Sequence, residues 1–282
     1  VGGEFNEHLV KLTNPLESSE SQESISSADG AVYDLLQADG NIWVAGGKGV
    51  GYIDGGSYED GFDTGRVWTL ATYDSHLVTG GSFSFKNAGN AVTNLAIFEI
   101  TGTNLELAHG FKTTGIVRAL ATDGDTLFVG GEFTKIGEAE DAAADLSERN
   151  LIAAVKLSDN SVKDFGGING IGNVESLQLD ASDGVLYVGG RFSEAEDHQG
   201  NSKPRHRLAA FDAENGNLLG WSPGISDSGQ VDTMLILDGF SDNGRDMLII
   251  GGDFEEIDDD PRSKIAGMEI ENVEEGYGSI AW

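Results

Sequence analysis

Short apolar runs flanked by turn residues recur along the whole chain. Residues 185–188 and 247–250 are examples, each with four consecutive apolar residues between Gly or Asp. Continuous apolar runs of this length are typical of strands buried on both faces, because a helix needs a longer periodic stretch. The pattern therefore predicts an all-β fold.

These runs are organised as six imperfect copies of one repeat. Each copy has a double glycine after an apolar run, at Gly2-Gly3, Gly46-Gly47, Gly80-Gly81, Gly130-Gly131, Gly189-Gly190 and Gly251-Gly252. The fourth and fifth copies show four runs each, at 116–122, 126–133, 151–157 and 161–165, and at 174–179, 185–192, 208–212 and 217–221. Four short strands per copy, named A to D, predict a β-propeller of about six four-stranded antiparallel blades.

Glycine and aspartate mark the strand ends. Asp39-Gly40, Asp123-Gly124 and Asp183-Gly184 separate strands A and B and supply the positive φ of a tight hairpin. The double glycine ends strand B, where a missing side chain permits a bulge or the close approach of another backbone. The second copy has almost no connection between strands B and C, so we expect a compact blade.

The 282 residues are expected to form a single propeller domain spanning positions 1–282. The sequence begins inside a strand B, because the phrase at 1–5 recurs at 129–133. We therefore expect a segment of a longer protein, with further domains of the same polypeptide outside this sequence. The first copy lacks a strand A. A six-bladed ring completed by a strand outside the sequence and a ring with a seventh blade outside it are the alternatives.

Charge limits the choice of partner. The chain has 17 Lys and Arg against 48 Asp and Glu, a formal net charge of −31. Such a surface repels nucleic acid and anionic lipid, so we expect no nucleic-acid partner. No run approaches the roughly 18 to 20 apolar residues of a membrane helix, so we expect no membrane span within this sequence. The acidity suits either a saline habitat or the binding of cations.

Acidic residues gather between strands B and C of the last three copies. The fifth and sixth copies carry the predicted metal ligands Glu194, Glu196, Asp197, Asp258, Asp259 and Asp260. Because hard divalent ions prefer carboxylate and carbonyl oxygens, Ca²⁺ is the candidate cofactor, and a patch for a cationic partner is related. The alternative is a solvated acidic surface, which the sequence favours because no loop has the EF-hand spacing.

An Arg-x-x-[Leu/Ile]-Ala phrase follows these acidic segments, at 149–153, 205–209 and 262–266, and Trp221 and Trp282 close strand D. Together with Gly-Gly-x-Phe, these motifs resemble the delta-60 type β-propeller repeats of extracellular proteins, and more distantly kelch repeats. The likeness is specific for three copies, since Asn6 and Val92 replace the Arg in two others. The resemblance implies a propeller of a secreted or cell-surface protein that has no assigned enzymatic activity.

Two roles are open for the arginines. Arg149, Arg205 and Arg262 either brace their loops through bidentate hydrogen bonds or bind an anionic group of a ligand. The negative field favours bracing. Trp221 and Trp68 either fill the core or stack a sugar at the mouth of the propeller.

Three functions follow from these residues. The first is a non-catalytic recognition or adhesion propeller, extracellular or on the cell surface, that binds a protein or glycan. The second is a structural subunit of an extracellular assembly. The third is a carbohydrate-active or metal-dependent enzyme, with His198 and His206 near the acids of copy five. We expect no enzyme, because no nucleophile elbow, P-loop or dinucleotide fingerprint occurs.

Overall fold

The computed structural model describes residues 31–54, 57–170, 172–225, 229–240, 245–270 and 273, together with the strand positions 10–13, 21–24 and 279–280. No α-helix occurs in these ranges, which confirms the all-β prediction. A helix long and apolar enough to span a membrane is likewise not found among them. The chain divides into two compact units: Val1–Val117 with Gly137–Leu146, and Arg118–Ile136 with Ser147–Trp282.

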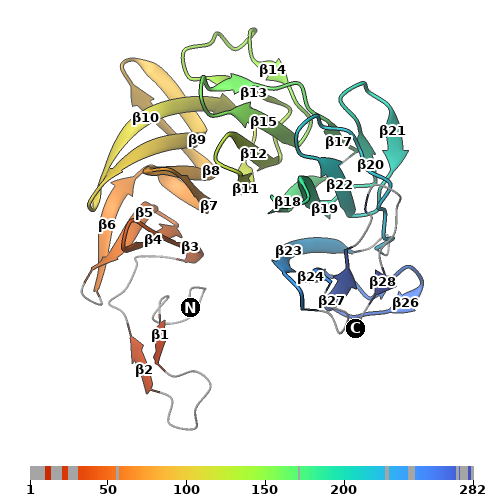
Figure 1. Cartoon of the computed structure of the whole chain (residues 1–282). Coiled ribbons are helices and arrows are strands. Elements are labelled where there is room, and N and C mark those ends of the chain that lie inside the picture. The colour runs from red at the N-terminus through yellow and green to blue at the C-terminus, as the bar shows by residue number, and fades with distance from the viewer. Residues whose placement is uncertain are drawn as a thin grey trace. The chain divides into compact units, whose positions relative to one another are not determined.

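Unit 1 contains the sheets of the second and third copies, called sheets 2 and 3 (Figure 1). Sheet 2 has the order β3-β4-β5-β6, with bounds Val32–Ala38, Asn41–Gly46, Gly49–Asp54 and Ser57–Asp63. Sheet 3 contains β7, β8, β9 and β10, with bounds Gly65–Tyr73, His76–Asn87, Asn90–Thr101 and Asn104–Thr113. Gly46 pairs with Gly49 across a two-residue turn, which confirms the compact second blade.

Unit 2 contains the sheets of the last three copies, called sheets 4, 5 and 6 (Figure 1). Sheet 4 comprises β11 Val117–Thr122, β12 Thr126–Gly131, β15 Ile152–Lys156 and β16 Ser161–Val162. Sheet 5 comprises β18 Asn173–Asp180, β19 Val185–Arg191 and β22 Leu208–Asp212. Sheet 6 comprises β23 Gln230–Leu237, β24 Met247–Asp253, β27 Ile265–Glu269 and β28 Ser279–Ile280.

Sheet 5 is buried on both faces, as the short apolar runs predict. Leu186 and Phe211 pack in one core cluster with Phe128 of sheet 4. On the opposite face, Tyr187 packs in a second cluster with Leu248 of sheet 6. Adjacent residues of one strand thus belong to different cores, because side chains alternate across a sheet.

The two glycines of the double-glycine phrase are required for different steric reasons. A Cβ on the first, Gly130 or Gly189, would lie 2.5 or 2.8 Å from a valine of the next sheet. A Cβ on the second would lie 2.2 Å from a backbone oxygen of strand A in the same sheet, at Gly81, Gly190 and Gly252 alike. Of the two sequence expectations, the close approach of another backbone is confirmed at these positions, and the bulge lies in strand A opposite the glycines.

The predicted fourth strand of copy five, at 217–221, is wrong as a strand. Only an isolated bridge forms there, between Phe211 and Leu218, with a further hydrogen bond from the N–H of Leu219 to the oxygen of Ala210. The segment leaves the ladder because the N–H of Trp221 donates instead to the oxygen of Val273, at 3.0 Å.

The connections between strands B and C contain hairpins in the last three copies. The hairpin strands are β13 Lys135–Glu138 with β14 Ser147–Glu148, β20 Glu194–Glu196 with β21 Ser202–Pro204, and β25 Glu256–Ile257 with β26 Asp260–Pro261. A short strand, β17 Gly167–Asn169, pairs with β20. The sequence predicts loops at these places. In the structure, part of each loop forms a short antiparallel hairpin.

Part of the first copy is described only as strands. β1 Val10–Thr13 pairs antiparallel with β2 Ser21–Ser24. The phrase at 1–5 and Trp282 lie outside the described residues. The single domain over 1–282 and the blade number of the ring stay predictions.

Candidate functional site

Strand A carries one extra residue opposite the end of strand B. It faces the double glycine in sheets 3, 5 and 6, and Ala45-Gly46 in sheet 2. Register shifts leave Tyr33, Trp68, Glu175 and Asp232 unpaired in sheets 2, 3, 5 and 6. Arg118 has the same place in sheet 4, because it follows the valine that precedes each of these residues. A β-bulge redirects its side chain and recurs beside functional sites. We call these five the bulge residues and take them as candidate recognition residues.

In unit 1 the bulge residues form an aromatic cluster. The ring centroids of Tyr33 and Trp68 lie 4.1 Å apart with an interplanar angle of 42°. The guanidinium carbon of Arg66 lies 5.9 Å from the centroid of Tyr33 and 5.3 Å from that of Trp68, within the range of a cation–π contact. Both rings are half-buried and Arg66 is exposed. The cluster therefore presents aromatic surface and a positive charge together.

A buried carboxylate fixes the two strands that carry the aromatic cluster. The two oxygens of Asp34 accept hydrogen bonds from the N–H groups of Leu35 and Leu70, each at 2.8 Å, and so join β3 to β7. Burial raises the pKa of Asp34, and the bonds from Leu70 and Leu35 oppose that rise. The strands that carry the aromatic pair are thus joined by one carboxylate that accepts two backbone N–H groups.

In unit 2 the bulge residues are charged. Arg118 contacts Oε1 of Glu132 with Nε and Nη2, both at 2.6 Å, and Oε2 of Glu175 with Nη1 at 3.5 Å. Asn173 donates a further hydrogen bond to Oε1 of Glu175. Asp232, the bulge residue of sheet 6, is exposed. One arginine therefore faces three acidic residues in this region, which favours the attraction of cations over anions.

We expect Glu175→Gln to change the pH dependence of stability. Burial is the main cause that raises the pKa of Glu175 above its ordinary value of 4.5; Arg118 opposes the rise, and Asp232 and Glu132 add to it. The stability that this group contributes is therefore present below its unfolded-state pKa and is lost as the pH rises through the folded-state pKa. Glutamine does not titrate. As the pH rises above the ordinary value of 4.5, the variant should gain stability relative to the wild type in urea denaturation, and parallel profiles would contradict the assignment.

The three predicted ligand-binding arginines hold backbone carbonyls. Nη1 of Arg149, Arg205 and Arg262 donates to the carbonyl of the preceding residue, at 2.6, 2.8 and 2.8 Å. Nη2 of Arg149 and of Arg205 donates to a carbonyl 14 residues later, that of Lys163 at 2.7 Å and that of Leu219 at 2.6 Å. Arg149 also lies 3.6 Å from Asp164. The hydrogen bonds go mainly to backbone carbonyls, and only Arg262 also lies near a carboxylate of its loop, Asp260 at 4.0 Å. This arrangement favours bracing.

Trp221, the fourth predicted ligand-binding residue, lies in a core. It is 2% exposed, and its ring meets that of Tyr187 edge-on with centroids 5.2 Å apart. Trp68, by contrast, is half-buried in the aromatic cluster. Of the two tryptophans for which the sequence left stacking on a ligand open, only Trp68 offers surface in this structure.

The acids of copy five stabilise their own hairpin. Glu194 accepts a hydrogen bond from the hydroxyl of Ser202 at 3.1 Å, and Glu196 accepts one from the amide of Asn169 at 2.7 Å. Asp197 accepts bonds from the side chain and backbone of Asn201 and from the N–H of Gln199. The side-chain bond from Asn201 is the main cause that lowers the pKa of Asp197. These carboxylates are held in place as hairpin supports.

The acids of copy six form a tight turn. Asp258 and Asp259 have φ of 49° and 66°, as a type I′ turn between β25 and β26 requires. Oδ1 of Asp258 accepts the N–H of Gly224 at 2.6 Å, and Asp260 lies 4.0 Å from Arg262. Within the described ranges, no three His, Cys, Asp or Glu side chains gather closely enough to hold a metal ion. Calcium binding stays a prediction for which these residues provide no assembled site.

Three of the predicted residues do meet at one cleft. A hollow of about 260 Å³ in unit 2 is lined by Arg149, Glu196 and Asp197, with Asp164, Phe165 and His198. Arg149 lies between β14 and β15, whereas Glu196 ends β20 and Asp197 follows it, beside the three-stranded sheet β17-β20-β21. The cleft joins one fixed guanidinium to several carboxylates, so it is a polar surface.

Sequence reasoning does not identify the bulge residues as a set of equivalent positions. Each follows a valine, in the pairs Val32-Tyr33, Val67-Trp68, Val117-Arg118, Val174-Glu175 and Val231-Asp232. The repeat frame shows that this position varies while the residue before it is always valine, and that signal is present in the sequence. Local sequence reasoning singles out only Trp68, as an isolated aromatic residue.

Comparisons with known proteins give the fold. No family model matches the chain, and no curated protein matches it. A chain from the "Crystal Structure of Mitotic Checkpoint Complex" is similar with a TM-score of 0.61 and 14% identity, over 94% of this chain and 70% of that chain. The matched chain is a WD40-type β-propeller. At this identity the likeness shows the β-propeller fold alone, and the resemblance to delta-60 repeats stays a prediction.

Proposed function

We propose that this chain is a non-catalytic scaffold that binds a protein partner through the bulge residues of unit 1. The aromatic cluster of Tyr33, Trp68 and Arg66 carries the proposal. Tryptophan, tyrosine and arginine are the residues most enriched at the energetic centres of protein interfaces. Here all three occur in one cluster, with both rings partly open to solvent and the cation stacked over them.

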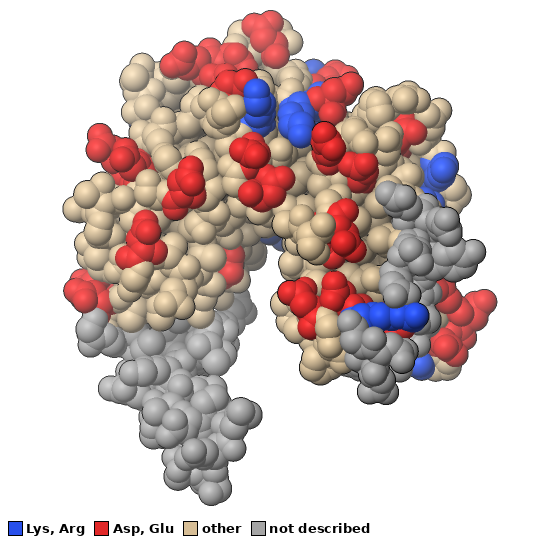
Figure 2. Space-filling view, in the orientation of Figure 1, with Lys and Arg blue, Asp and Glu red and all other residues tan. Residues whose placement is uncertain are grey.

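The partner is expected to be basic. The chain carries a net charge of −31, and Figure 2 shows Asp and Glu side chains spread over the displayed face with few Lys and Arg among them. Opposite charges accelerate encounter, and a field of this sign disfavours anionic partners. A basic segment of the partner would be attracted by the acidic residues of this chain and could pack against the rings of the aromatic cluster. Association should therefore slow as salt concentration rises.

The finer parts of the proposal concern the assembly and its place. We extend it to a propeller of six blades on a secreted or cell-surface protein, where a glycan is a second class of partner. The support is the sixfold double-glycine phrase and the three Arg-x-x-[Leu/Ile]-Ala copies. Surface labelling of cells that produce the full-length protein would test the location.

Trp68→Ala should weaken partner binding by about 2 kcal/mol, a loss typical of a residue at an energetic centre. Peptides selected from a random phage-displayed library on the wild-type chain serve as the probe, and calorimetry measures their affinity for wild type and variant. The selected peptides are expected to be rich in Lys and Arg, and to contact the aromatic rings with an arginine or an aromatic side chain.

The control is Phe240→Ala. Phe240 is a 61% exposed aromatic residue outside the cluster, so its removal should leave peptide affinity unchanged. Circular dichroism and thermal melting confirm that each variant is folded. If the selected peptides bind Trp68→Ala as tightly as the wild type, the aromatic cluster is not the recognition site and the proposal fails.

A further inference from the structure

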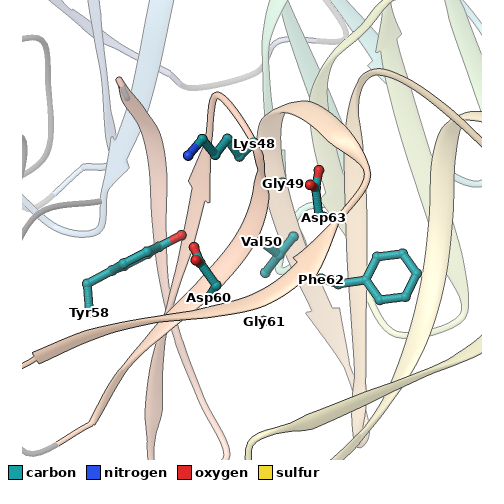
Figure 3. A pocket seen from close by; sticks show the side chains of 8 residues that line it. All are labelled: Lys48, Gly49, Val50, Tyr58, Asp60, Gly61, Phe62 and Asp63. Atoms are coloured by element: carbon teal, nitrogen blue, oxygen red, sulfur yellow. The ribbon is translucent and has the colours of Figure 1, made fainter. Parts of the chain in front are cut away.

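A second cavity lies on sheet 2, apart from the aromatic cluster and its function. It has a volume of about 260 Å³ and lies between the β4–β5 turn and strand β6. Its polar lining consists of Lys48 from the turn and Tyr58, Asp60 and Asp63 from β6. Figure 3 shows Tyr58 and Asp60 directed to the same side as Lys48, whereas Phe62 points the opposite way. The cavity is smaller than the roughly 300–1,000 Å³ of drug-sized ligand sites, so it suits a ligand of one ring.

A bulge in β6 opens this cavity. Val50 pairs with Phe62 and Gly51 pairs with Asp60, so Gly61 has no partner across the ladder. The peptide groups beside a bulged residue are left outside the regular hydrogen-bond pattern. A Cβ on Gly61 would lie 2.7 Å from the oxygen of Val50, and this position therefore requires glycine. The bulge thus adds backbone donor and acceptor groups to the side chains of the wall.

The floor of the cavity is rigid. Val50 is 3% exposed and belongs to the core cluster of unit 1, against which Phe62 packs. The outer edge of the Tyr58 ring and its hydroxyl oxygen lie over Gly51, where a Cβ would be 2.3 to 2.4 Å from them, and Tyr58 forms part of the cavity lining. Anchored walls reduce the entropy that a ligand must offset on binding.

The cavity lining combines hydrogen-bond donors and acceptors, and this combination indicates which kind of ligand it can bind. Carboxylates only accept hydrogen bonds, an ammonium only donates them, and a tyrosine hydroxyl and a peptide do both. Hydroxyl groups of a polyol complement every one of these. A charged or zwitterionic ligand would also have to lose the hydration of its own charges, which a neutral polyol does not carry.

We infer that this cavity binds a neutral monosaccharide unit, with Asp60 and Asp63 accepting hydrogen bonds from its hydroxyl groups and Lys48 and Tyr58 donating to its oxygens. The site is independent of the protein-binding proposal, because it uses none of the bulge residues of strand A. The hydroxyl-rich ring occupies the opening that Gly61 leaves.

The test is a saturation-transfer NMR titration with the methyl glycosides of glucose, galactose and mannose. At least one should bind the wild type with a Kd on the order of 1 mM, near −4 kcal/mol, as befits a small ligand in an open site. Asp60→Asn and Asp63→Asn should each raise that Kd about tenfold, because each replaces an oxygen acceptor by a donor.

Glu59→Gln is the matched control. Glu59 is an exposed acid in the same strand that is not part of the cavity lining, so its replacement should leave the Kd unchanged. Three results would overturn the inference. They are no binding of any of the three glycosides, equal loss in Glu59→Gln and Asp60→Asn, or binding of free glycine or arginine that Asp60→Asn abolishes while the glycosides do not bind.

Discussion

Gly190→Ala is expected to lower the free energy of unfolding by about 3 kcal/mol, at the upper end of the cost of forcing atoms into a packed site. The new Cβ would lie 2.2 Å from the oxygen of Asn173 and 3.0 Å from the Cα of Val174. Both neighbours are backbone atoms at the bulge of strand A, so neither can turn away as a side chain would. Urea denaturation followed by circular dichroism measures the loss.

Two further glycine-to-alanine variants should lose less stability than Gly190→Ala. Gly189→Ala should cost less, because its nearest atoms belong to the side chains of Val231 and Met234, which can move. Gly47→Ala should be neutral, since nothing lies within 4 Å of its added Cβ. Gly47 is one residue beyond Gly46, which pairs with Val32 as Gly190 pairs with Val174. Equal stability of the Gly190 and Gly47 variants would refute the account of the double glycine. If Gly190→Ala does not fold, the free energies of unfolding of Gly189→Ala and Gly47→Ala are compared instead. The Gly189 variant should be the less stable of the two, and equal values would refute the account.

Arg205→Ala is expected to lower the free energy of unfolding by about 3 kcal/mol, because hydrogen bonds to a charged group contribute about 1.5–3 kcal/mol each. The side chain joins the carbonyls of Pro204 and Leu219, at 2.8 and 2.6 Å, in a residue only 6% exposed. Its loss leaves both carbonyls without that donor. Burial also lowers the pKa of Arg205, as expected of a cation held away from water.

Arg205→Lys separates geometry from charge. The lysine keeps the cation but cannot span both carbonyls, so most of the loss should persist. Lys203→Ala removes an exposed cation from the same hairpin and should leave stability unchanged. A stable Arg205→Ala variant that no longer binds the selected peptides or the methyl glycosides would show the opposite, namely that this arginine binds a ligand.

The same segment shows why the bracing could be inferred and its partners could not. The phrase at 205–209 places an arginine just before strand C, where bracing of a loop is the favoured role. The oxygen that it contacts belongs to Leu219, and the return of that segment depends on where Trp221 is held. Trp221 in turn is fixed by Tyr187 and Val273, contacts that no local pattern encodes.

The acidic segments show what their local hydrogen bonds add. Their charge and their place in the repeat leave a Ca²⁺ site and a solvated acidic surface open, and the sequence favours the solvated surface. Local hydrogen bonds compete for the same oxygens, as in Asp197, whose carboxylate accepts the N–H groups of its own turn. Short polar side chains commonly satisfy turns in this way, and a count of acids does not reveal it.

The all-β class, the repeat frame, the double glycines and the polyanionic surface follow from the sequence alone, because strand length, turn residues and charge act locally or as sums. The contact of Tyr33 with Trp68, the contact of Arg118 with Glu175 and the cleft shared by Arg149 and Glu196 depend on how distant segments pack. Those neighbours lie on different strands, and one extra residue in strand A changes which way a side chain points. Sheet packing and register therefore set the site, and neither is fixed by any single segment of the chain.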